Sequence, residues 1–431
     1  MNKYFIGLCL LYLVVYLIAY TFHGQLISIL KVDAKLEYRQ TFLLQLLQGF
    51  RFFSAFYWTR ISDKRHNHRA IITLSVFGYY LSFVLMANLK RIFEPRSTLF
   101  YIFIFVAQVF NITFNSAIFP SLDALTLNYL HNQDIPKSKF GSIRLFGSFG
   151  HAMTNIVGYC VGRVLKKETY NRNLGLIKIC YSGVYIPFFL LVIYFLVPQF
   201  EVKKIKNDEV ASKTTKRKIN IFNELARIPK LFYVFCISLI AFGFLRCSLS
   251  DSLDAYMMDL GVSAANRHLL TAYRTVIEVL VYLGGGYVEK YFNIDLMFLF
   301  ALICGSVRSG IYTFTNISNM DKSKQEIPFY ISEIMKAFWS AFYGYSSSRI
   351  ARSFCREDNQ SIVSGLVYGC YNGLSYLIFY STAYTCFSFA NFNFKGSQFR
   401  GLFLIGLIFI LLAIVFHSLF LTVRRKIKNK G

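Results

Sequence analysis

The sequence predicts an all-α membrane protein in which twelve transmembrane helices form two six-helix bundles. Of the 431 residues, 55% are hydrophobic and 18% are aromatic, which is far from the balance of a soluble domain. Twelve apolar runs each have about the 20 residues that a helix needs to cross a bilayer. A single long polar segment separates the first six runs from the last six.

The apolar runs place the predicted spans one by one. The first run is too long for the hydrophobic region of a signal peptide and lacks a small-residue cleavage site, so we expect it to be the first span. The spans of the first half are expected near residues 5–30, 40–58, 70–89, 98–119, 141–163 and 176–198. Those of the second half are expected near residues 229–250, 265–287, 294–314, 328–348, 361–386 and 400–422.

A lysine-rich segment joins the two halves. Its centre reads EVKKIKNDEVASKTTKRKIN and holds few aromatic residues, which is typical of a solvated linker. The expected organisation is an N-terminal bundle over residues 1–198, a basic cytoplasmic linker over 199–228, a C-terminal bundle over 229–422 and a basic cytoplasmic tail over 423–431.

The chain is strongly basic, with 47 Lys and Arg against 22 Asp and Glu and a formal net charge of +25. In a soluble protein such an excess would favour a nucleic-acid partner. In a chain with many spans, the gathering of Lys and Arg in cytoplasmic segments accounts for most of it. More Lys and Arg fall on the side of the termini, so we expect both termini to be cytoplasmic. We expect no nucleic-acid partner, and we expect the protein to lie in the plasma membrane.

The sequence shows no sign of a metal site, a cofactor or an enzyme. The nine cysteines are scattered singly, with no CxxC pair and no Cys/His cluster at the spacing of metal ligands. No nucleophile stands beside a base in a recognisable motif, and no phosphate-binding loop is present. We therefore expect neither metal nor cofactor, and no catalytic residues.

Glycines line one side of the fifth predicted span and recur in the eleventh, which holds the same position in the second half. Small residues let two helix backbones approach closely in a membrane. A parallel repeat of two six-span bundles, with the solute site at their interface, is a known transporter architecture. We predict that these glycines pack against the opposite half; they are Gly147, Gly150, Gly158, Gly162, Gly365, Gly369 and Gly373.

Two charges stand beside the glycine side of the fifth span. Asp123 lies at the end of the fourth apolar run and Arg144 near the start of the fifth. Charged residues within a membrane are costly and usually face a cavity or each other. We name Asp123 and Arg144 as candidate solute ligands, with juxtamembrane charges as the alternative interpretation.

The ionisable residues of spans eight to ten are the main functional candidates. Arg274 and Glu278 are four residues apart and can pair on one helix face, and Glu333 and Lys336 are three apart. Arg308 has no local partner, so either Glu278 or Glu333 is expected to meet it. A carboxyl that moves relative to an arginine takes up and releases a proton. These residues are therefore candidates for proton coupling, and a static salt bridge remains the alternative.

Other polar residues in the spans carry weaker signals. Asp251, Asp254 and Tyr256 follow the seventh span and are interpreted as solvated residues at the mouth of a cavity. The further candidate solute ligands are His23 in the first span and His151 in the fifth, with Arg51 in the second as a weak candidate. A lone histidine in an apolar helix is more often a packing residue.

Several motifs resemble the major facilitator superfamily, in the branch related to lactose permease, nucleoside:proton symporters and phenylpropionate-type permeases. The segment FGSIRLFGSFG, residues 140–150, is similar to that branch's Tyr-Gly-x-x-Arg-x-Trp-Gly-Ser motif, with Phe140 and Phe146 in place of its aromatic residues. Glu278 and Arg308 stand where the branch has a Glu in span eight and an Arg in span nine, which implies proton-linked roles for both.

Two further segments depart from the patterns of this superfamily. The loop TRISDKRHNHR, residues 59–69, resembles the signature Gly-x-x-x-Asp-Arg-x-Gly-Arg-Arg, which implies a cytoplasmic gating loop. It keeps Asp63, Lys64 and Arg69 but lacks both glycines. Where the branch often has His-Gly in span ten, this chain has Lys336 and Ala337, so a fixed cation replaces a titrating imidazole.

These features predict a monomeric secondary transporter that moves a small polar organic solute with a proton by alternating access. The resemblance implies a sugar or a nucleoside as the solute. Arg144, Arg308 and Lys336 favour an anionic metabolite, such as a nucleotide or a carboxylate, as an alternative. The lost loop glycines favour another alternative, a membrane receptor or scaffold that keeps the fold and transports nothing.

Overall fold

The computed structural model describes residues 3–22, 26–51, 53–54, 57–58, 61, 67–95, 97–135, 139–165, 169–170, 173–197, 228–321, 324–354, 360–389, 392, 394 and 396–428. In these ranges the regular structure is helical, apart from one isolated bridge between Phe394 and Ser397. Seven of the described helices are long and apolar enough to cross a membrane. The predicted all-α membrane class is confirmed, and the count of twelve spans stays a prediction.

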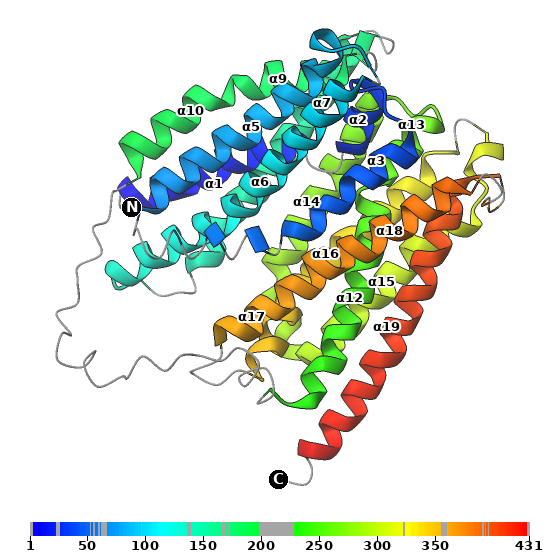
Figure 1. Cartoon of the computed structure of the whole chain (residues 1–431). Helices are drawn as coiled ribbons and strands as arrows, with labels where there is room; N and C mark the ends of the chain where they lie inside the picture. The colour runs from blue at the N-terminus through cyan, green and yellow to red at the C-terminus, as the bar shows by residue number, and fades with distance from the viewer. Residues whose placement is uncertain are drawn as a thin grey trace.

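The first half of the chain forms the blue to green helices of Figure 1. They are α1 (Lys3–Phe22), α2 (Leu26–Val32), α3 (Tyr38–Gln45), the 3₁₀ helix η1 (Leu46–Phe50), α5 (His68–Ile92), α6 (Thr98–Asn132), α7 (Lys139–Val164), α9 (Leu174–Gly183), α10 (Tyr185–Leu191) and the π-helical η2 (Val192–Leu196).

The second half forms the light green to red helices. They are α12 (Lys230–Ser250), α13 (Leu253–Asp259), α14 (Ala264–Tyr291), α15 (Ile294–Phe314), the 3₁₀ helix η3 (Ile317–Asn319), α16 (Ile327–Arg352), α17 (Gln360–Gly369), the π-helical η4 (Cys370–Leu374), α18 (Ser375–Ser388) and α19 (Gln398–Lys428).

Two of the differences from the predicted spans concern the first and the fourth spans. The fourth span was expected to end near residue 119, but α6 continues through Pro120 to Asn132, so Asp123 lies inside a helix. Neighbouring helices allow proline inside a membrane helix because they can satisfy the freed backbone groups. The first expected span is divided into α1 and α2.

The two halves have separate hydrophobic cores. One core is built from side chains of residues 8–197 with Ala264, and the larger one from residues 228–421 with Ile27 and Phe42. The exact boundaries of the two bundles stay a prediction, since residues 198–227 lie outside the described residues. We call the side on which α1 begins and α19 ends the terminal side, and the opposite side the far side (Figure 1).

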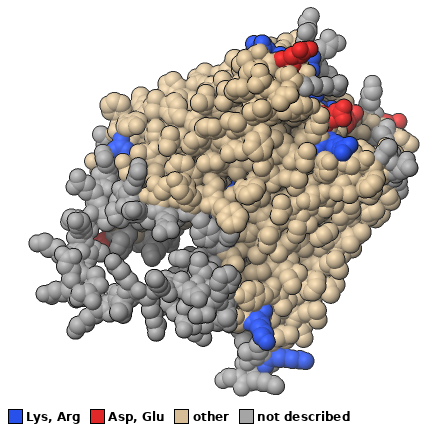
Figure 2. All heavy atoms as spheres, in the orientation of Figure 1, with Lys and Arg blue, Asp and Glu red and all other residues tan. Residues whose placement is uncertain are grey.

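The outer surface is largely apolar. In the view of Figure 2 the charged side chains lie mainly towards the two ends of the molecule, with a broad uncharged belt between them. Exposed apolar residues such as Phe103 of α6, Phe300 of α15 and Leu411 of α19 belong to this surface. A contiguous apolar surface of this kind is suited to contact with lipid tails.

The glycines of α7 pack against two different partners, which corrects one prediction. A Cβ added to Gly147 would lie 2.8 Å from the ring of Tyr16, and one added to Gly150 would lie 2.3 Å from the carbonyl oxygen of Leu13. Both contacts are with α1 of the same half. Because α1 passes alongside the first turns of α7, these two glycines join helices within the N-terminal half rather than across the interface.

The second glycine pair of α7 does face the other half. A Cβ on Gly158 would lie 2.8 Å from the ring of His268, and one on Gly162 would lie 3.0 Å from the backbone nitrogen of Ala265. Both partners belong to α14, so the interface between halves is built on the far-side part of α7. The proposed packing roles of Gly365, Gly369 and Gly373 stay predictions, and the surroundings of Gly365 lie outside the described part of the chain.

Candidate functional site

Several cavities lie between the described parts of the two halves, and three of them exceed 100 Å³. Their volumes are about 170, 490 and 740 Å³, and Tyr20 of α1 lines all three, so they meet near the middle of the molecule. Their walls carry most of the charged residues that the sequence places inside spans. A polar space of this size between two apolar bundles can hold a small organic molecule, for which pockets of roughly 300–1,000 Å³ are usual.

Glu333 of α16 lies at the centre of a network of charged side chains and contacts two arginines. Its Oε1 lies 2.8 Å from Nη2 of Arg308 on α15, and its Oε2 lies 3.3 Å from Nη1 of Arg274 on α14. Arg308 also donates from Nε to Oγ of Ser332 at 3.0 Å. Arg308 has no exposed surface, so its charge requires a nearby acid. That acid is Glu333, one of the two predicted candidates.

The predicted pairing of Arg274 with Glu278 is therefore wrong. The two residues lie on one helix face, but Arg274 turns to Glu333 on the neighbouring helix. Glu278 lines both the 170 Å³ and the 740 Å³ cavities. No lysine or arginine nitrogen of the described residues lies within 4.0 Å of its carboxylate. Glu278 is thus an acid that faces the cavities without an ion pair.

The contacts of Lys336 also differ from those predicted. It was expected to share a face with Glu333 and pair with it, yet its Nζ lies 4.0 Å from the centroid of the Trp339 ring and contacts no described carboxylate within 4.0 Å. Lys336 lines the 170 Å³ cavity and is 9% exposed. The cation of span ten is therefore stabilised by an aromatic face rather than by the neighbouring acid.

Asp123 and Arg144 come together at the cavity wall. Nη1 of Arg144 lies 3.8 Å from Oδ2 of Asp123, and the Tyr12 hydroxyl donates to Oδ1 of Asp123 at 2.6 Å. Both charged residues line the 490 Å³ cavity. His151 lines the 170 Å³ and 740 Å³ cavities, and its ring centroid lies 3.9 Å from that of Tyr20.

A cavity lies between described residues of the two halves towards the terminal side. The 740 Å³ cavity reaches the first turns of α7, where it is lined by Phe140 and Gly141, and it is bounded across from them by Leu283 of α14 and Gly344 of α16. A Cβ added to Gly141 would meet no atom within 4 Å. The cavity system therefore extends towards the terminal side.

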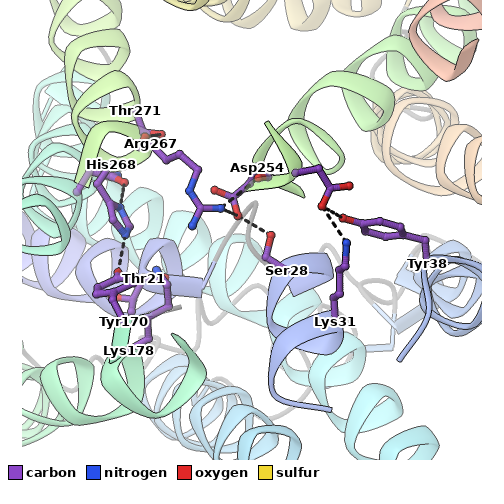
Figure 3. Close-up of polar contacts among 12 residues, drawn as sticks. Thr21, Ser28, Lys31, Tyr38, Tyr170, Lys178, Asp254, Arg267, His268 and Thr271 are labelled. Carbon is purple, nitrogen blue, oxygen red and sulfur yellow. Dashed lines mark hydrogen bonds and ion pairs between the residues drawn. The ribbon is translucent and has the colours of Figure 1, made fainter. Parts of the chain in front are cut away.

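On the far side the halves are held together by a set of polar contacts, which we call the far-side contacts (Figure 3). Oγ of Ser28 donates to Oδ2 of Asp254 at 2.5 Å, and Nη1 of Arg267 lies 3.2 Å from the same oxygen. Nζ of Lys31 and the hydroxyl of Tyr38 reach Oδ1 of Asp259 at 2.9 and 2.8 Å. Ser28, Lys31 and Tyr38 come from the first half and the other residues from the second.

A histidine adds two contacts to this set. Nε2 of His268 lies 3.0 Å from the hydroxyl of Tyr170, and its Nδ1 lies 3.1 Å from Oδ1 of Asn155. Tyr170 and Asn155 belong to the first half, so the ring of His268 bridges the halves next to Gly158. The far-side contacts consist of these residues and those named above.

The prediction of solvated residues after the seventh span is wrong for Asp254 and Tyr256, and Asp251 is half-buried at the wall of a small cavity. Asp254 is 7% exposed within the far-side contacts, and Tyr256 is 3% exposed among aromatic rings that include Tyr312 and Phe403. Asp251 accepts a hydrogen bond from the hydroxyl of Tyr380 at 2.7 Å. Burial replaces solvation here because α13 folds back against the first half.

Some candidates lie outside the described residues: His23, Asp63 and Lys64. Arg69, the third residue of the expected gating loop, donates from Nη2 to the carbonyl oxygen of Tyr194 at 3.1 Å, at the end of η2. Within the described part of the chain, no three His, Cys, Asp or Glu side chains are grouped in a way that could hold a metal ion.

Sequence reasoning missed Arg246 of α12 and gave Arg51 little weight. Arg246 lines the 170 Å³ and 490 Å³ cavities, and Arg51 lines the 490 Å³ cavity. The signal for Arg246 was present, since it is a cation inside the seventh apolar run.

Two helical halves around a central polar cavity, with buried charges at its wall, define the fold of a major facilitator transporter. The chain belongs to the MFS_1-like family, whose pattern it matches over residues 6–390. No curated protein matches the sequence.

Solved transporters share this fold at low sequence identity. A mutant form of the nucleoside transporter NupG is similar with a TM-score of 0.77 and 12% identity, covering 97% of this chain and 100% of that one. The xylose transporter XylE from E. coli gives a TM-score of 0.62 and 14% identity over 96% and 97% of the two chains. Tetrameric PepTSo2 gives 0.71 and 12% over 100% of both. The family and these neighbours are membrane transporters rather than enzymes, as the sequence predicts.

Proposed function

We propose that this protein is a secondary active transporter that moves a small polar organic solute by alternating access and couples the movement to a proton through Glu278. The similarity to NupG and XylE supports a sugar-sized or nucleoside-sized solute. In this proposal the protein acts as a monomer in the plasma membrane, with its termini and the terminal side of the cavity in the cytoplasm.

The observation that carries proton coupling is the contrast between two acids. Glu333 is fixed between Arg308 and Arg274, so its negative charge is compensated. Glu278 lines the cavities and forms no ion pair with any described residue. A carboxyl that lacks a fixed counterion and lies in a poorly solvated space changes protonation most readily when its surroundings change. Glu278 is therefore the proton carrier in this proposal.

Alternating access is supported by a difference between the two sides of the molecule: polar contacts join the halves on the far side, and cavities lie between them towards the terminal side. The far-side contacts close the space between the halves, and the cavities extend towards the terminal side. Breaking those contacts while the terminal side closes would present the same residues to the other compartment. With cytoplasmic termini, this arrangement is the inward-facing state.

Reconstitution with a proton gradient tests the proposal. Wild-type protein in proteoliposomes is expected to accumulate one labelled solute from a panel of neutral and anionic sugars, nucleosides, nucleotides and carboxylates when the gradient is imposed. Glu278→Gln keeps the volume of the side chain and removes its titration, so exchange across the membrane should persist while accumulation is lost. Glu94→Gln is the matched control, because Glu94 is exposed on the far side and away from the cavities.

Two outcomes would contradict parts of this proposal. Full gradient-driven accumulation by Glu278→Gln would remove Glu278 from the proton route. A well-folded protein that neither exchanges nor accumulates any neutral or anionic solute would instead favour a membrane receptor or scaffold with the same fold.

A further inference from the structure

Two guanidinium groups from opposite halves of the molecule approach one tyrosine ring. Arg51 follows η1 in the first half, and Arg246 lies on α12 in the second. The Cζ atom of Arg51 lies 5.3 Å from the centroid of the Tyr376 ring, and the Cζ atom of Arg246 lies 4.7 Å from the same centroid. Both arginines line the 490 Å³ cavity, so two cations meet at the interface of the halves.

Neither arginine forms an ion pair with an acid in the described part of the chain. No carboxylate oxygen of the described residues lies within 4.0 Å of either guanidinium group. Arg51 donates from Nη1 to the hydroxyl of Tyr376 at 3.5 Å, and Arg246 donates from Nη2 to the carbonyl oxygen of Tyr371 at 3.5 Å and to Sγ of Cys247 at 3.7 Å. The Nε atoms of both arginines are buried without a hydrogen-bond partner. Their donors are therefore poorly satisfied.

The nearby acids are engaged elsewhere. Asp123, the one carboxylate among the described residues that line the 490 Å³ cavity, pairs with Arg144. Asp251 lies in the adjoining small cavity that Arg51 also lines, and its Oδ2 accepts a hydrogen bond from Tyr380. Asp251 forms no ion pair with either arginine, and its single negative charge can offset only one of them, so at least one of the two positive charges is left over.

Arg51 and Arg246 are half-buried. Half-buried cations without an ion pair carry a desolvation cost, and a bound anion offsets that cost. The planar fork of a guanidinium matches the oxygens of a phosphate or a carboxylate and donates two parallel hydrogen bonds to them. Two such forks match an oxyanion with two negative charges. Asn115 of α6 and Asn372 of η4 line the same cavity and offer amide groups to the uncharged part of a ligand.

We propose that Arg51 and Arg246 form a subsite for a doubly charged oxyanion of the transported solute, either a phosphate monoester or a dicarboxylate. The inference rests on the proposed transport function and names the chemical class of its solute. Because the two arginines come from different halves, an anion held between them neutralises both and draws the halves together. Such an anion would favour closure of the cavity around the solute.

Ligand-induced stabilisation of the purified full-length protein tests the subsite without requiring transport. The probes are inorganic phosphate, glucose 6-phosphate, succinate, glucose and adenosine. The variants are Arg51→Gln, Arg246→Gln and Arg246→Lys, with Arg425→Gln as the matched control at the exposed end of α19. Glucose 6-phosphate and succinate separate the two sources of the oxyanion.

The expected result is that doubly charged oxyanions raise the melting temperature of the wild type and of Arg425→Gln more than glucose or adenosine do. Arg51→Gln and Arg246→Gln should each weaken oxyanion binding about 10- to 100-fold, the usual effect of losing hydrogen bonds from a charged group. Arg246→Lys keeps the charge and should lose less. Without ligand, Arg246→Gln should melt at a higher temperature than the wild type, because an uncompensated charge is removed.

Three results would overturn the subsite. The first is equal oxyanion binding by the wild type and both Gln variants. The second is no response of the wild type to any doubly charged oxyanion, inorganic phosphate at tens of millimolar included. The third is a lower melting temperature of ligand-free Arg246→Gln together with unchanged oxyanion binding, which would assign the arginine to packing.

Transport measurements separate this inference from the proposed function. Oxyanion binding that depends on both arginines, in a protein that moves no solute, would support the subsite and contradict transport. Transport of a neutral sugar or nucleoside that is unchanged in Arg51→Gln and Arg246→Gln would support transport and contradict the subsite.

Discussion

Nη2 of Arg308 lies 2.8 Å from Oε1 of Glu333, and Arg308 has no exposed surface while Glu333 is 4% exposed. The second oxygen of Glu333 meets Arg274, so one acid ties together α14, α15 and α16. An ion pair buried in this way fixes how three helices are rotated relative to one another. The cavity-lining position of Glu278 follows, because its neighbour Arg274 is held by Glu333.

Glu333→Gln should destabilise the protein strongly, because it leaves Arg308 buried without a counterion. Breaking a buried ion pair costs about 3–5 kcal/mol in soluble proteins. Thermal unfolding in detergent and expression yield measure the effect. The Glu333→Gln/Arg308→Gln double variant should recover part of the loss, since no unpaired charge remains at position 308. Equal stability of the wild type and the Glu333→Gln single variant would show that the pair contributes little.

The glycines of α7 should give two different defects when replaced by leucine. Gly147→Leu meets the ring of Tyr16 within the first half and should lower the melting temperature. Gly158→Leu meets His268 across the interface and should weaken closure of the far side, with a smaller loss of stability. Gly141→Leu is the control, because a Cβ there meets nothing within 4 Å. Wild-type behaviour of Gly147→Leu would mean that α1 does not pack there.

Weakening the far-side contacts should shift the protein away from the state described here. A Ser28→Ala/Asp259→Ala double variant removes three hydrogen bonds between the halves. Such bonds contribute about 1 kcal/mol each in net terms, so the ratio of the two states should change roughly tenfold or more.

A thiol reporter measures this shift. In a background without the native cysteines, Ser142→Cys places a thiol in the wall of the 740 Å³ cavity, where a small polar reagent should label it from the terminal side. Labelling should slow when Ser28→Ala and Asp259→Ala are added. Unchanged labelling would mean that these contacts do not set the balance between the two states.

Glycosylation tests the orientation of the chain. Asn316 begins the sequon Asn316-Ile317-Ser318 on the far side just after α15. Asn359 begins the sequon Asn359-Gln360-Ser361 and lies outside the described residues; the predicted topology puts this sequon in the loop after the tenth span. Only a lumenal sequon is modified. With cytoplasmic termini, expression in a eukaryotic secretory system should modify Asn316 if its distance from the membrane permits. Modification of Asn359 would reverse the proposed orientation.

The sequence by itself determined the membrane class, the position of most helices and the buried charges to examine. Apolar runs of this length must become helices in a membrane, because each backbone group needs a partner within its own segment. The sequence also predicted that Arg308 pairs with an acid on another helix, because an unpaired charge inside a membrane is costly. These inferences depend on local composition and need no knowledge of neighbouring helices.

The tertiary structure alone decided which charges meet. Sequence spacing favoured pairs of Arg274 with Glu278 and of Glu333 with Lys336, but helix rotation brought Arg274 and Arg308 to Glu333 instead. It also brought Arg51 and Arg246 to one tyrosine, although 195 positions separate them in the sequence (246 − 51). Pairing between helices depends on their rotation and relative height, which are set by packing across the whole bundle and leave no local pattern in the chain.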